Sequence, residues 1–244
     1  MKIRSVEYAG TIVDPGAPLP EDLPQVAFAG RSNVGKSSLI NTLLQRTRKK
    51  IAHVSATPGK TRAVNFFRVN DRFFLVDLPG YGYARVPGAM RESWADLMEG
   101  YLARADGPLA VVHLLDVRHP PTAADVQMLS YLAEVGLPAV VVLTKIDKLT
   151  RSERARRLKA APDRLGLDPE QIIPFSSKTG EGRDVLLEAL DALLTEAETG
   201  AGGGAEGAPP LAGDVSSEGA GAPGEDGDHG NPEPAETTTG ESRG

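Results

Sequence analysis

The segment Gly30–Ser37, which reads GRSNVGKS, constrains the fold of this 244-residue chain more than any other. It matches the spacing G-x-x-x-x-G-K-[ST], a loop that joins a buried strand to a helix and surrounds phosphate groups. The short apolar run Gln25–Ala29 precedes the loop, and Ser38–Leu44 follows it with apolar residues at helical spacing. The sequence therefore predicts a strand, a phosphate-binding loop and a helix. The alternative is a glycine-rich turn without a ligand, and the flanking pattern argues against it.

The residue types in this loop suit a bound triphosphate. Gly30 and Gly35 let the backbone approach phosphate oxygens in conformations that a Cβ atom forbids, and successive N–H groups then form an anion-binding nest. Lys36 adds a positive charge for the β- and γ-phosphates, and Ser37 offers a hydroxyl to Mg²⁺ at the positive end of the next helix. We expect the nucleotide to contact the whole loop, namely Gly30, Arg31, Ser32, Asn33, Val34, Gly35, Lys36, Ser37 and Ser38.

The remaining hydrophobic runs alternate between strand and helix patterns. The β-rich runs at 63–69 and 72–76 predict a hairpin. Continuous apolar runs at 110–115 and 139–143 predict central parallel strands that are buried on both faces. Further predicted elements are a short strand at 171–175 and helices near 91–104, 122–135, 152–161 and 183–196. This alternation predicts a three-layer α/β/α fold with a mostly parallel sheet and one antiparallel edge strand.

Composition divides the chain into three parts. Residues 1–21 are expected to form an N-terminal extension with an edge strand at Ile3–Ile12, and residues 22–196 a nucleotide-binding domain. Residues 197–244 are rich in glycine, proline and acids and contain no aromatic residue. We expect this tail to be disordered, because it cannot bury enough apolar surface to offset the entropy of ordering.

The acidic tail dominates the net charge. From residue 200 onward, nine acidic residues and one basic residue give −8, against −6 for the whole chain, so residues 1–199 carry +2. A mildly basic folded part tolerates a polyanionic partner such as RNA. Cysteine is absent, which excludes disulfides and thiol chemistry, and no apolar run is long enough to span a bilayer. We therefore expect a cytoplasmic protein with neither DNA nor a membrane as partner.

One acid and two hydroxyls are expected to organise Mg²⁺. The segment Asp77-Leu78-Pro79-Gly80 has the D-x-x-G form, in which the acid organises the ion, often through water, and the glycine N–H contacts the γ-phosphate. Ser37 and Thr61 are the expected metal ligands, and phosphate oxygens and water take the other positions. We expect Lys36, Thr61 and Gly80 to act in phosphoryl transfer.

Two later segments select the base. Thr144-Lys145-Ile146-Asp147 fits [NT]-K-x-D, in which the Asp147 carboxylate accepts hydrogen bonds from the ring N–H and the exocyclic amine of guanine. Adenine lacks this pair of donors and leaves the buried acid unpaired, at a cost of about 1–3 kcal/mol or more. The Lys145 stem is expected to pack over the base, and the backbone of Phe175, Ser176, Ser177 and Lys178 to read the guanine carbonyl oxygen. The motifs together predict GTP and GDP as ligands.

With these motifs, residues 22–195 resemble the EngB family of bacterial P-loop GTPases, in the TrmE-Era-EngA-EngB-septin-like group. The matching segments are Val26–Ser38, Thr57–Thr61, Val76–Ala84, Leu143–Lys148 and Phe175–Lys178. GTPases in general share the first and the fourth, whereas the forms at Thr57–Thr61 and Val76–Ala84 are narrower. The resemblance implies that Gly59, Lys60, Thr61, Arg62 and Ala63 also line the nucleotide. It further implies a role in assembly of the large ribosomal subunit and a link to normal cell division and septation.

The residue after D-x-x-G bears on the rate of hydrolysis. Ras-like enzymes have a glutamine there that orients the attacking water, whereas this chain has Tyr81. We therefore expect slow intrinsic GTP hydrolysis, with the missing element supplied by a partner or an ion. Asn33 resembles the residue that helps to hold K⁺ in related GTPases, so K⁺ is a candidate cofactor.

Two clusters of basic residues are candidates for contact with ribosomal RNA of a large-subunit precursor, and an ordinary solvated face is an equal alternative for each. They comprise Arg46, Arg48, Lys49, Lys50, Lys60 and Arg62, and, on one helix, Arg151, Arg154, Arg156, Arg157 and Lys159. His113, within an apolar strand, is expected to be a satisfied core residue. Besides a GTPase switch, two functions remain: a small-molecule kinase, which would not need the guanine motifs, and a nucleotide-dependent binding module without significant hydrolysis.

Overall fold

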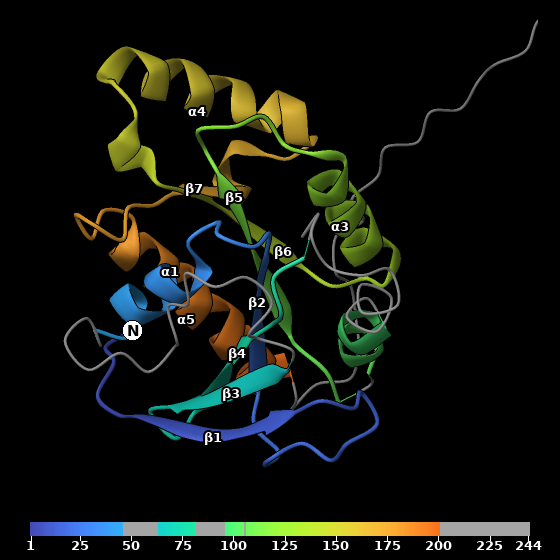
Figure 1. Cartoon of the computed structure of the whole chain (residues 1–244). Coiled ribbons are helices and arrows are strands. Elements are labelled where there is room, and N and C mark those ends of the chain that lie inside the picture. Colours follow the sequence, from blue (N-terminus) through green and yellow to red (C-terminus); the bar gives the residue numbers. More distant parts are fainter. Residues whose placement is uncertain (46–62, 82–95, 105, 201–244) are drawn as a thin grey trace, which may run out of the picture. The chain divides into compact units, whose positions relative to one another are not determined.

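The computed structural model describes residues 1–45, 63–81, 96–104 and 106–200 (Figure 1). In this part of the chain seven strands form one sheet in the order β1-β3-β4-β2-β5-β6-β7. The strands are β1 (Val6–Ile12), β2 (Gln25–Gly30), β3 (Val64–Val69), β4 (Phe73–Asp77), β5 (Ala110–Asp116), β6 (Ala139–Thr144) and β7 (Ile172–Pro174). The helices are α1 (Lys36–Leu43), α3 (Ala123–Glu134), α4 (Arg151–Leu165), α5 (Arg183–Gly200) and the short turns η1 (Ile146–Lys148) and η2 (Pro169–Gln171). Residues 96–102 are also helical.

Most of the sheet is parallel. Strands β4, β2, β5, β6 and β7 run in one direction. Strand β3 pairs antiparallel with β4 through the predicted hairpin at Asn70 and Asp71, and β1 pairs antiparallel with β3 at the edge. Both hairpin residues adopt positive φ angles, 54° and 52°, which asparagine and aspartate tolerate better than most residues. The predicted three-layer α/β/α fold, with a mostly parallel sheet and an antiparallel edge, is confirmed.

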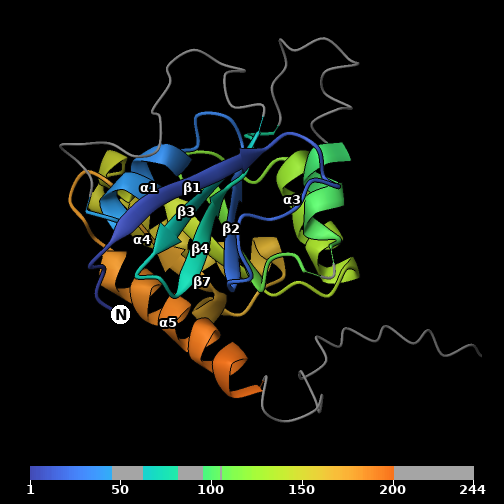
Figure 2. The same ribbon diagram turned by 90° about the horizontal axis from the view of Figure 1, so that it is seen from below.

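The central strand β2 requires cover on both faces. All six of its residues are buried, and alternate side chains point to opposite faces of the sheet. Val26 and Phe28 pack with residues of α1 and α5, whereas Ala27 and Ala29 pack with α3 and the helical residues 96–102. Figure 2 shows α1 and α5 on one side of the sheet and α3 on the other. Helix α4 packs over β5 and β6 in a third apolar cluster that α3 also joins.

Polar contacts at helix ends fix the elements that carry the site. Arg183, at the start of α5, donates to the carbonyl oxygens of Thr42 at 3.1 Å and Leu43 at 2.9 Å. A cation at that position satisfies the last carbonyls of α1 and complements its dipole. Arg183 thereby ties α1, the helix that follows the phosphate loop, to α5. Helix α4 begins with a capping box between Thr150 and Glu153.

Element ends differ from the predictions by a few residues, which is the usual uncertainty of sequence patterns. Helix α4 continues to Leu165 beyond the predicted end at 161, and α5 continues to Gly200, past the predicted start of the tail at 197. The predicted extension at 1–21 contributes β1 to the sheet. The tail from 201 onward lies outside the described residues. Among the described helices, none combines the length and the apolar surface that a bilayer crossing requires.

Candidate nucleotide-binding site

The predicted site segments lie at the same edge of the sheet, because each is at or just after the carboxyl end of a parallel strand. They are the phosphate loop, Asp77, Thr144–Asp147 and Phe175–Lys178. Side-chain contacts join these segments: Lys36 pairs with Asp77, and Lys145 Nζ donates to the carbonyl oxygen of Asn33 at 2.6 Å. They therefore converge at the edge where open α/β sheets bind ligands.

The phosphate loop has the backbone that an anion nest needs. Asn33 and Gly35 adopt left-handed conformations with φ of 65° and 108°. A Cβ atom on Gly30 would lie 2.9 Å from Val34 Cγ1, so a larger residue there would displace the loop. Helix α1 begins at Lys36 without a side-chain cap, and its first turn includes Ser37 and Ser38. Its first N–H groups are thus left for an anionic ligand.

Lys36 and Asp77 form a buried ion pair. Their side chains are only 9% and 6% exposed, and the Lys36 ammonium contacts the Asp77 carboxylate directly. The charge that would hold the β- and γ-phosphates is therefore balanced inside the protein by the acid expected to organise the metal. Breaking a buried pair by removing one partner is costly, because it leaves an uncompensated charge.

The donor set at this end fits Mg²⁺. Ser37 offers a hydroxyl and Asp77 a carboxylate, and Mg²⁺ prefers oxygen ligands while keeping several waters. Among the described residues, no group of three or more His, Cys, Asp or Glu side chains could hold a metal by itself. A magnesium ion here would therefore depend on phosphate oxygens and would bind with the nucleotide.

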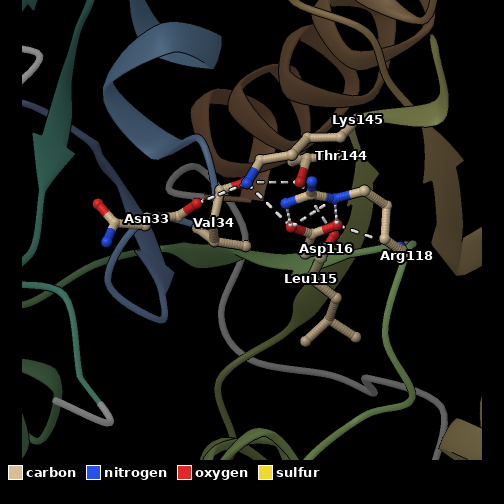
Figure 3. A network of polar contacts seen from close by, with 7 residues as sticks. All are labelled: Asn33, Val34, Leu115, Asp116, Arg118, Thr144 and Lys145. Carbon is tan, nitrogen blue, oxygen red and sulfur yellow. Dashed lines mark hydrogen bonds and ion pairs between the residues drawn. The ribbon is translucent and has the colours of Figure 1, made fainter. Parts of the chain in front are cut away.

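The side chains of Thr144 and Lys145 form hydrogen bonds with backbone carbonyl oxygens of the phosphate loop (Figure 3). Thr144 Oγ1, which is buried, lies 2.7 Å from the carbonyl oxygen of Val34 and 3.1 Å from that of Leu115. Lys145 adopts a left-handed φ of 63° and extends its ammonium group over the loop to Asn33. The segment expected to recognise the base is thus held in a fixed position relative to the phosphate loop.

Asp147 is oriented by Ser176. Ser176 Oγ, from a fully buried serine, donates to Asp147 Oδ1 at 2.8 Å. Ser176 Oγ in turn accepts hydrogen bonds from the backbone N–H groups of Lys178 and Thr179, each at 3.2 Å. Phe175 and Ile146 are buried beside them, and Thr42 Oγ1 of α1 donates to the Ser177 carbonyl at 3.3 Å. One carboxylate oxygen is thereby fixed by the protein, in the manner required of a group that reads a base edge.

Asp116, at the carboxyl end of β5, is a charged residue of this region that the sequence analysis missed. Its carboxylate pairs with Arg118 at 2.7 Å and Lys145 at 2.9 Å. Burial would raise the pKa of Asp116, but hydrogen bonds from Arg118 and Lys145 outweigh burial and hold that pKa well below its ordinary value. The signal that identified Asp77, an acid at the end of a buried strand, could also have identified Asp116.

The D-x-x-G segment packs directly on the phosphate loop. Leu78 is fully buried, Pro79 follows it, and a Cβ atom on Gly80 would lie 3.0 Å from Ser32 Oγ. The Ser32 N–H also donates to the Tyr81 carbonyl at 3.0 Å. Of the other expected nucleotide contacts, Ala63 lies just before β3 and is half-buried, whereas Gly59, Lys60, Thr61 and Arg62 lie outside the described residues.

The half-buried Tyr81 side chain contacts one residue of β5 and one of α3. Its hydroxyl donates to Asp125 Oδ1 at 3.0 Å and lies 3.2 Å from His113 Nε2, and its ring stacks on the His113 ring with centroids 6.0 Å apart. Burial, with Asp125 adding to it, raises the pKa of the Tyr81 phenol. Burial also lowers the pKa of His113 to about 4, so the ring is neutral at pH 7.

The prediction that His113 is a satisfied core residue is wrong in one respect. The side chain is fully buried, but Nδ1 has no hydrogen-bond partner among the described residues. Because Tyr81 donates its proton to Asp125, the neutral His113 ring is expected to donate from Nε2 and to leave Nδ1 as the unpaired acceptor. The pattern of an apolar strand carries no information on this pairing.

Comparison with known proteins identifies relatives of the chain. The family model described as "50S ribosome-binding GTPase" matches residues 25–145. The chain is 51% identical over 195 residues to the "Probable GTP-binding protein EngB" of Gemmatimonas aurantiaca, an alignment that covers 80% of this chain and 95% of the relative. The "Crystal structure of a probable GTP-binding protein engB" aligns with a TM-score of 0.60 and 25% identity, over 70% of this chain and 99% of that one.

A more distant structure shares the fold. Era in complex with MgGDPNP and nucleotides 1506–1542 of 16S ribosomal RNA aligns with a TM-score of 0.56 over 80% of this chain and 61% of that chain. At 21% identity, this likeness concerns the fold alone.

Proposed function

Because the chain belongs to the EngB family of P-loop GTPases, we propose that it acts as a slow GTPase switch in assembly of the large ribosomal subunit. Through this role we link it to normal cell division and septation, and we assign it to the cytoplasm. The proposal is carried by one observation: Lys36 and Asp77 meet at one end of the site, while Asp147 is oriented by Ser176 at the other.

We assign the residue roles as follows within a nucleotide-binding domain at 22–196. The phosphate loop and Lys36 hold the β- and γ-phosphates, Asp147 reads guanine, and Ser37 and Thr61 hold Mg²⁺. When bound, Mg²⁺ would neutralise the negative charge that develops on phosphate oxygens during transfer. Because Lys36 is paired with Asp77, binding exchanges its carboxylate partner for phosphate oxygens. The Gly80 N–H contacts the γ-phosphate.

The slow rate follows from Tyr81. It occupies the position after D-x-x-G and is tied to Asp125, so it is unavailable to orient an attacking water. A ribosomal particle supplies the missing element, or K⁺ does so beside Asn33. If single-turnover hydrolysis has the same rate in K⁺ and Na⁺ buffers, with and without particles, the K⁺ part is wrong.

Ribosomal RNA is the proposed macromolecular partner. The family model is named for ribosome binding, and Era, which shares this fold, binds ribosomal RNA. On α4, Arg151, Arg156 and Lys159 are exposed, whereas Arg154 is already paired with Glu181. Contacts to phosphates should weaken steeply with salt. Arg46, Arg48, Lys49 and Lys50 lie outside the described residues.

Sedimentation of the protein with 50S precursors in the GDP state and in the state with a non-hydrolysable GTP analogue tests this function. We expect association in one nucleotide state only, and phosphate release that rises in the presence of particles. Equal association in both states would contradict the switch. Association without any stimulated phosphate release would instead favour the alternative, a nucleotide-dependent binding module without significant hydrolysis.

A further inference from the structure

A cavity of about 270 Å³ lies beside the phosphate loop. Its walls come from the loop residues Arg31–Val34, the connection Leu115–Pro121 and helix α4. Lys36, Asp77 and Asp147 do not line it. Figure 3 shows part of one wall, where Lys145 crosses from β6 to the loop and Arg118 lies over Asp116. The cavity therefore shares Arg31–Val34 and Lys145 with the candidate nucleotide site, but not the lysine assigned to the β- and γ-phosphates, the acid expected to organise the metal or the acid assigned to the base edge.

The charge of this cavity is strongly positive. Its lining includes five cations, namely Arg31, Arg118, Lys145, Arg157 and Arg164, and two acids, Asp116 and Asp125. Both acids are already engaged: Asp116 pairs with Arg118 and Lys145, and Asp125 accepts hydrogen bonds from Tyr81 and Thr122. The side chains of Arg31, Arg157 and Arg164 make no hydrogen bond or ion pair within the described part of the chain. The cavity is therefore lined by more cations than acids, and three of its arginines have side-chain donors without a partner among the described residues.

Helix α4 presents two of these cations on one face. Arg157, Ala161 and Arg164 are spaced four and three residues apart, so they lie above one another along the helix, and all three line the cavity. Ala161 is small and buried, which leaves room between the two arginines. Arg156, the neighbour of Arg157, is exposed and does not line the cavity.

Arg157 carries an unsatisfied donor. Its Nε is buried, yet it has no hydrogen-bond partner among the described residues. A buried N–H of a charged group without an acceptor costs free energy, and native proteins leave few such groups without a ligand or water to pair them. An anion in the cavity would satisfy this donor and offset the surplus positive charge.

We propose that this cavity is a second anion site that binds a phosphate group, with Arg157 and Arg164 as its principal donors. Arginine suits phosphate because its planar donors match the phosphate oxygens. The volume lies just below the usual range of small-ligand pockets, which suits a phosphate with a small attached group. Two sources carry this chemistry: a phosphodiester of an RNA strand, and a free phosphorylated metabolite.

The test uses the full chain saturated with Mg²⁺ and GDP, so that the phosphate loop is occupied. The probes are inorganic phosphate, ribose 5-phosphate and a short oligoribonucleotide, and the readout is the NMR shift of the backbone amides of Val117 and Ala161. We expect saturable shifts at these amides. Arg157→Gln and Arg164→Gln should each weaken binding about tenfold, the value of one charge-assisted hydrogen bond. Arg4→Gln makes the same charge change at an exposed arginine that neither lines the cavity nor belongs to the proposed RNA contacts, and it should weaken binding less than about twofold.

The probes distinguish the sources. Tighter binding of the oligoribonucleotide than of ribose 5-phosphate, with the gain lost in Arg157→Gln, indicates RNA; the reverse order indicates a metabolite. Absence of saturable shifts, or an equal loss in Arg4→Gln, overturns the proposal. Arg164 is exposed, so Arg164→Gln keeps the test valid if Arg157→Gln does not fold. Failure of the switch function would appear in sedimentation with 50S precursors, which this experiment does not measure.

Discussion

The two ends of the candidate nucleotide site differ in how their polar groups are satisfied. At the base end, hydrogen bonds hold Thr144, Lys145, Ser176 and one carboxylate oxygen of Asp147. The other oxygen, Asp147 Oδ2, has no hydrogen-bond partner within the described part of the chain. At the phosphate end, Lys36 and Asp77 satisfy each other, and both are expected to take new partners when Mg²⁺ and nucleotide bind. The base end is therefore organised before the ligand arrives, whereas the phosphate end must exchange partners.

This difference matches two tasks. Selection of guanine over adenine requires fixed donors and acceptors, because an unpaired buried group penalises the wrong base only if it cannot relax. A switch requires an arrangement with two alternatives, which the ligand biases by its differential contacts. The following predictions test whether the two ends behave as differently as their contacts indicate.

The largest effect is expected from Lys36→Met at the phosphate end. Without nucleotide it leaves the buried Asp77 carboxylate unpaired, so the free energy of unfolding should fall by about 3–5 kcal/mol in urea titrations. The double variant Lys36→Met/Asp77→Leu should recover most of this stability, because it replaces the ion pair with apolar groups. If the single variant is as stable as the wild type, the pair does not hold this end together.

The pH dependence of the free energy of unfolding should reveal the titration of His113, which lies beside the phosphate end of the site. Its pKa is lowered from 6.5 to about 4 in the folded state by burial, so between these values the unfolded chain binds a proton that the folded chain does not. Stability is therefore fully present above about pH 6.5 and falls as pH decreases toward 4, by about 3 kcal/mol. Urea titrations from pH 7 to 4 measure this decrease.

His113→Gln provides the comparison, because glutamine does not titrate. The difference in pH dependence between wild type and variant isolates His113 from the carboxylates, which also titrate in this range. Parallel curves for the two proteins would show that His113 is charged or solvated in the folded state.

At the base end, Asp147→Ala should reduce the preference for guanine over adenine nucleotides by about 1–3 kcal/mol, or roughly 5- to 150-fold, because it removes the acceptor that adenine cannot satisfy. Calorimetry with GDP and ADP measures the ratio. Ser176→Ala should produce a smaller change in the same direction, since it only frees the orientation of Asp147. An unchanged ratio in both variants would refute base recognition by Asp147.

The smallest effect on hydrolysis is expected from Tyr81→Phe. The variant loses the hydrogen bonds to Asp125 and His113 and should be destabilised by about 1 kcal/mol. Its single-turnover GTP hydrolysis should remain within about twofold of wild type, because the bound hydroxyl takes no part in the reaction. A large fall in rate with unchanged nucleotide affinity would assign the hydroxyl a direct catalytic role.

The local pattern of the sequence was sufficient for the framework of the site. The strand, glycine-rich loop and helix at 25–44, the D-x-x-G segment after β4 and the T-K-x-D segment after β6 lie where predicted. Their meeting could also be anticipated, since parallel strands end at the same edge of a sheet. Hydrophobic periodicity and turn residues act over a few positions, so they can be read without knowing the fold.

Only the tertiary structure decided which side chains pair. Lys36 and Asp77 are 41 residues apart in sequence, and they meet because β4 lies beside β2 in the sheet. Likewise, Tyr81 reaches His113 and Asp125 because β5 lies on the other side of β2 and α3 packs over it. Strand order brings these groups together, and local residue patterns do not encode strand order. The ion pair, the tyrosine contacts and the cationic cavity therefore became visible only in the folded chain.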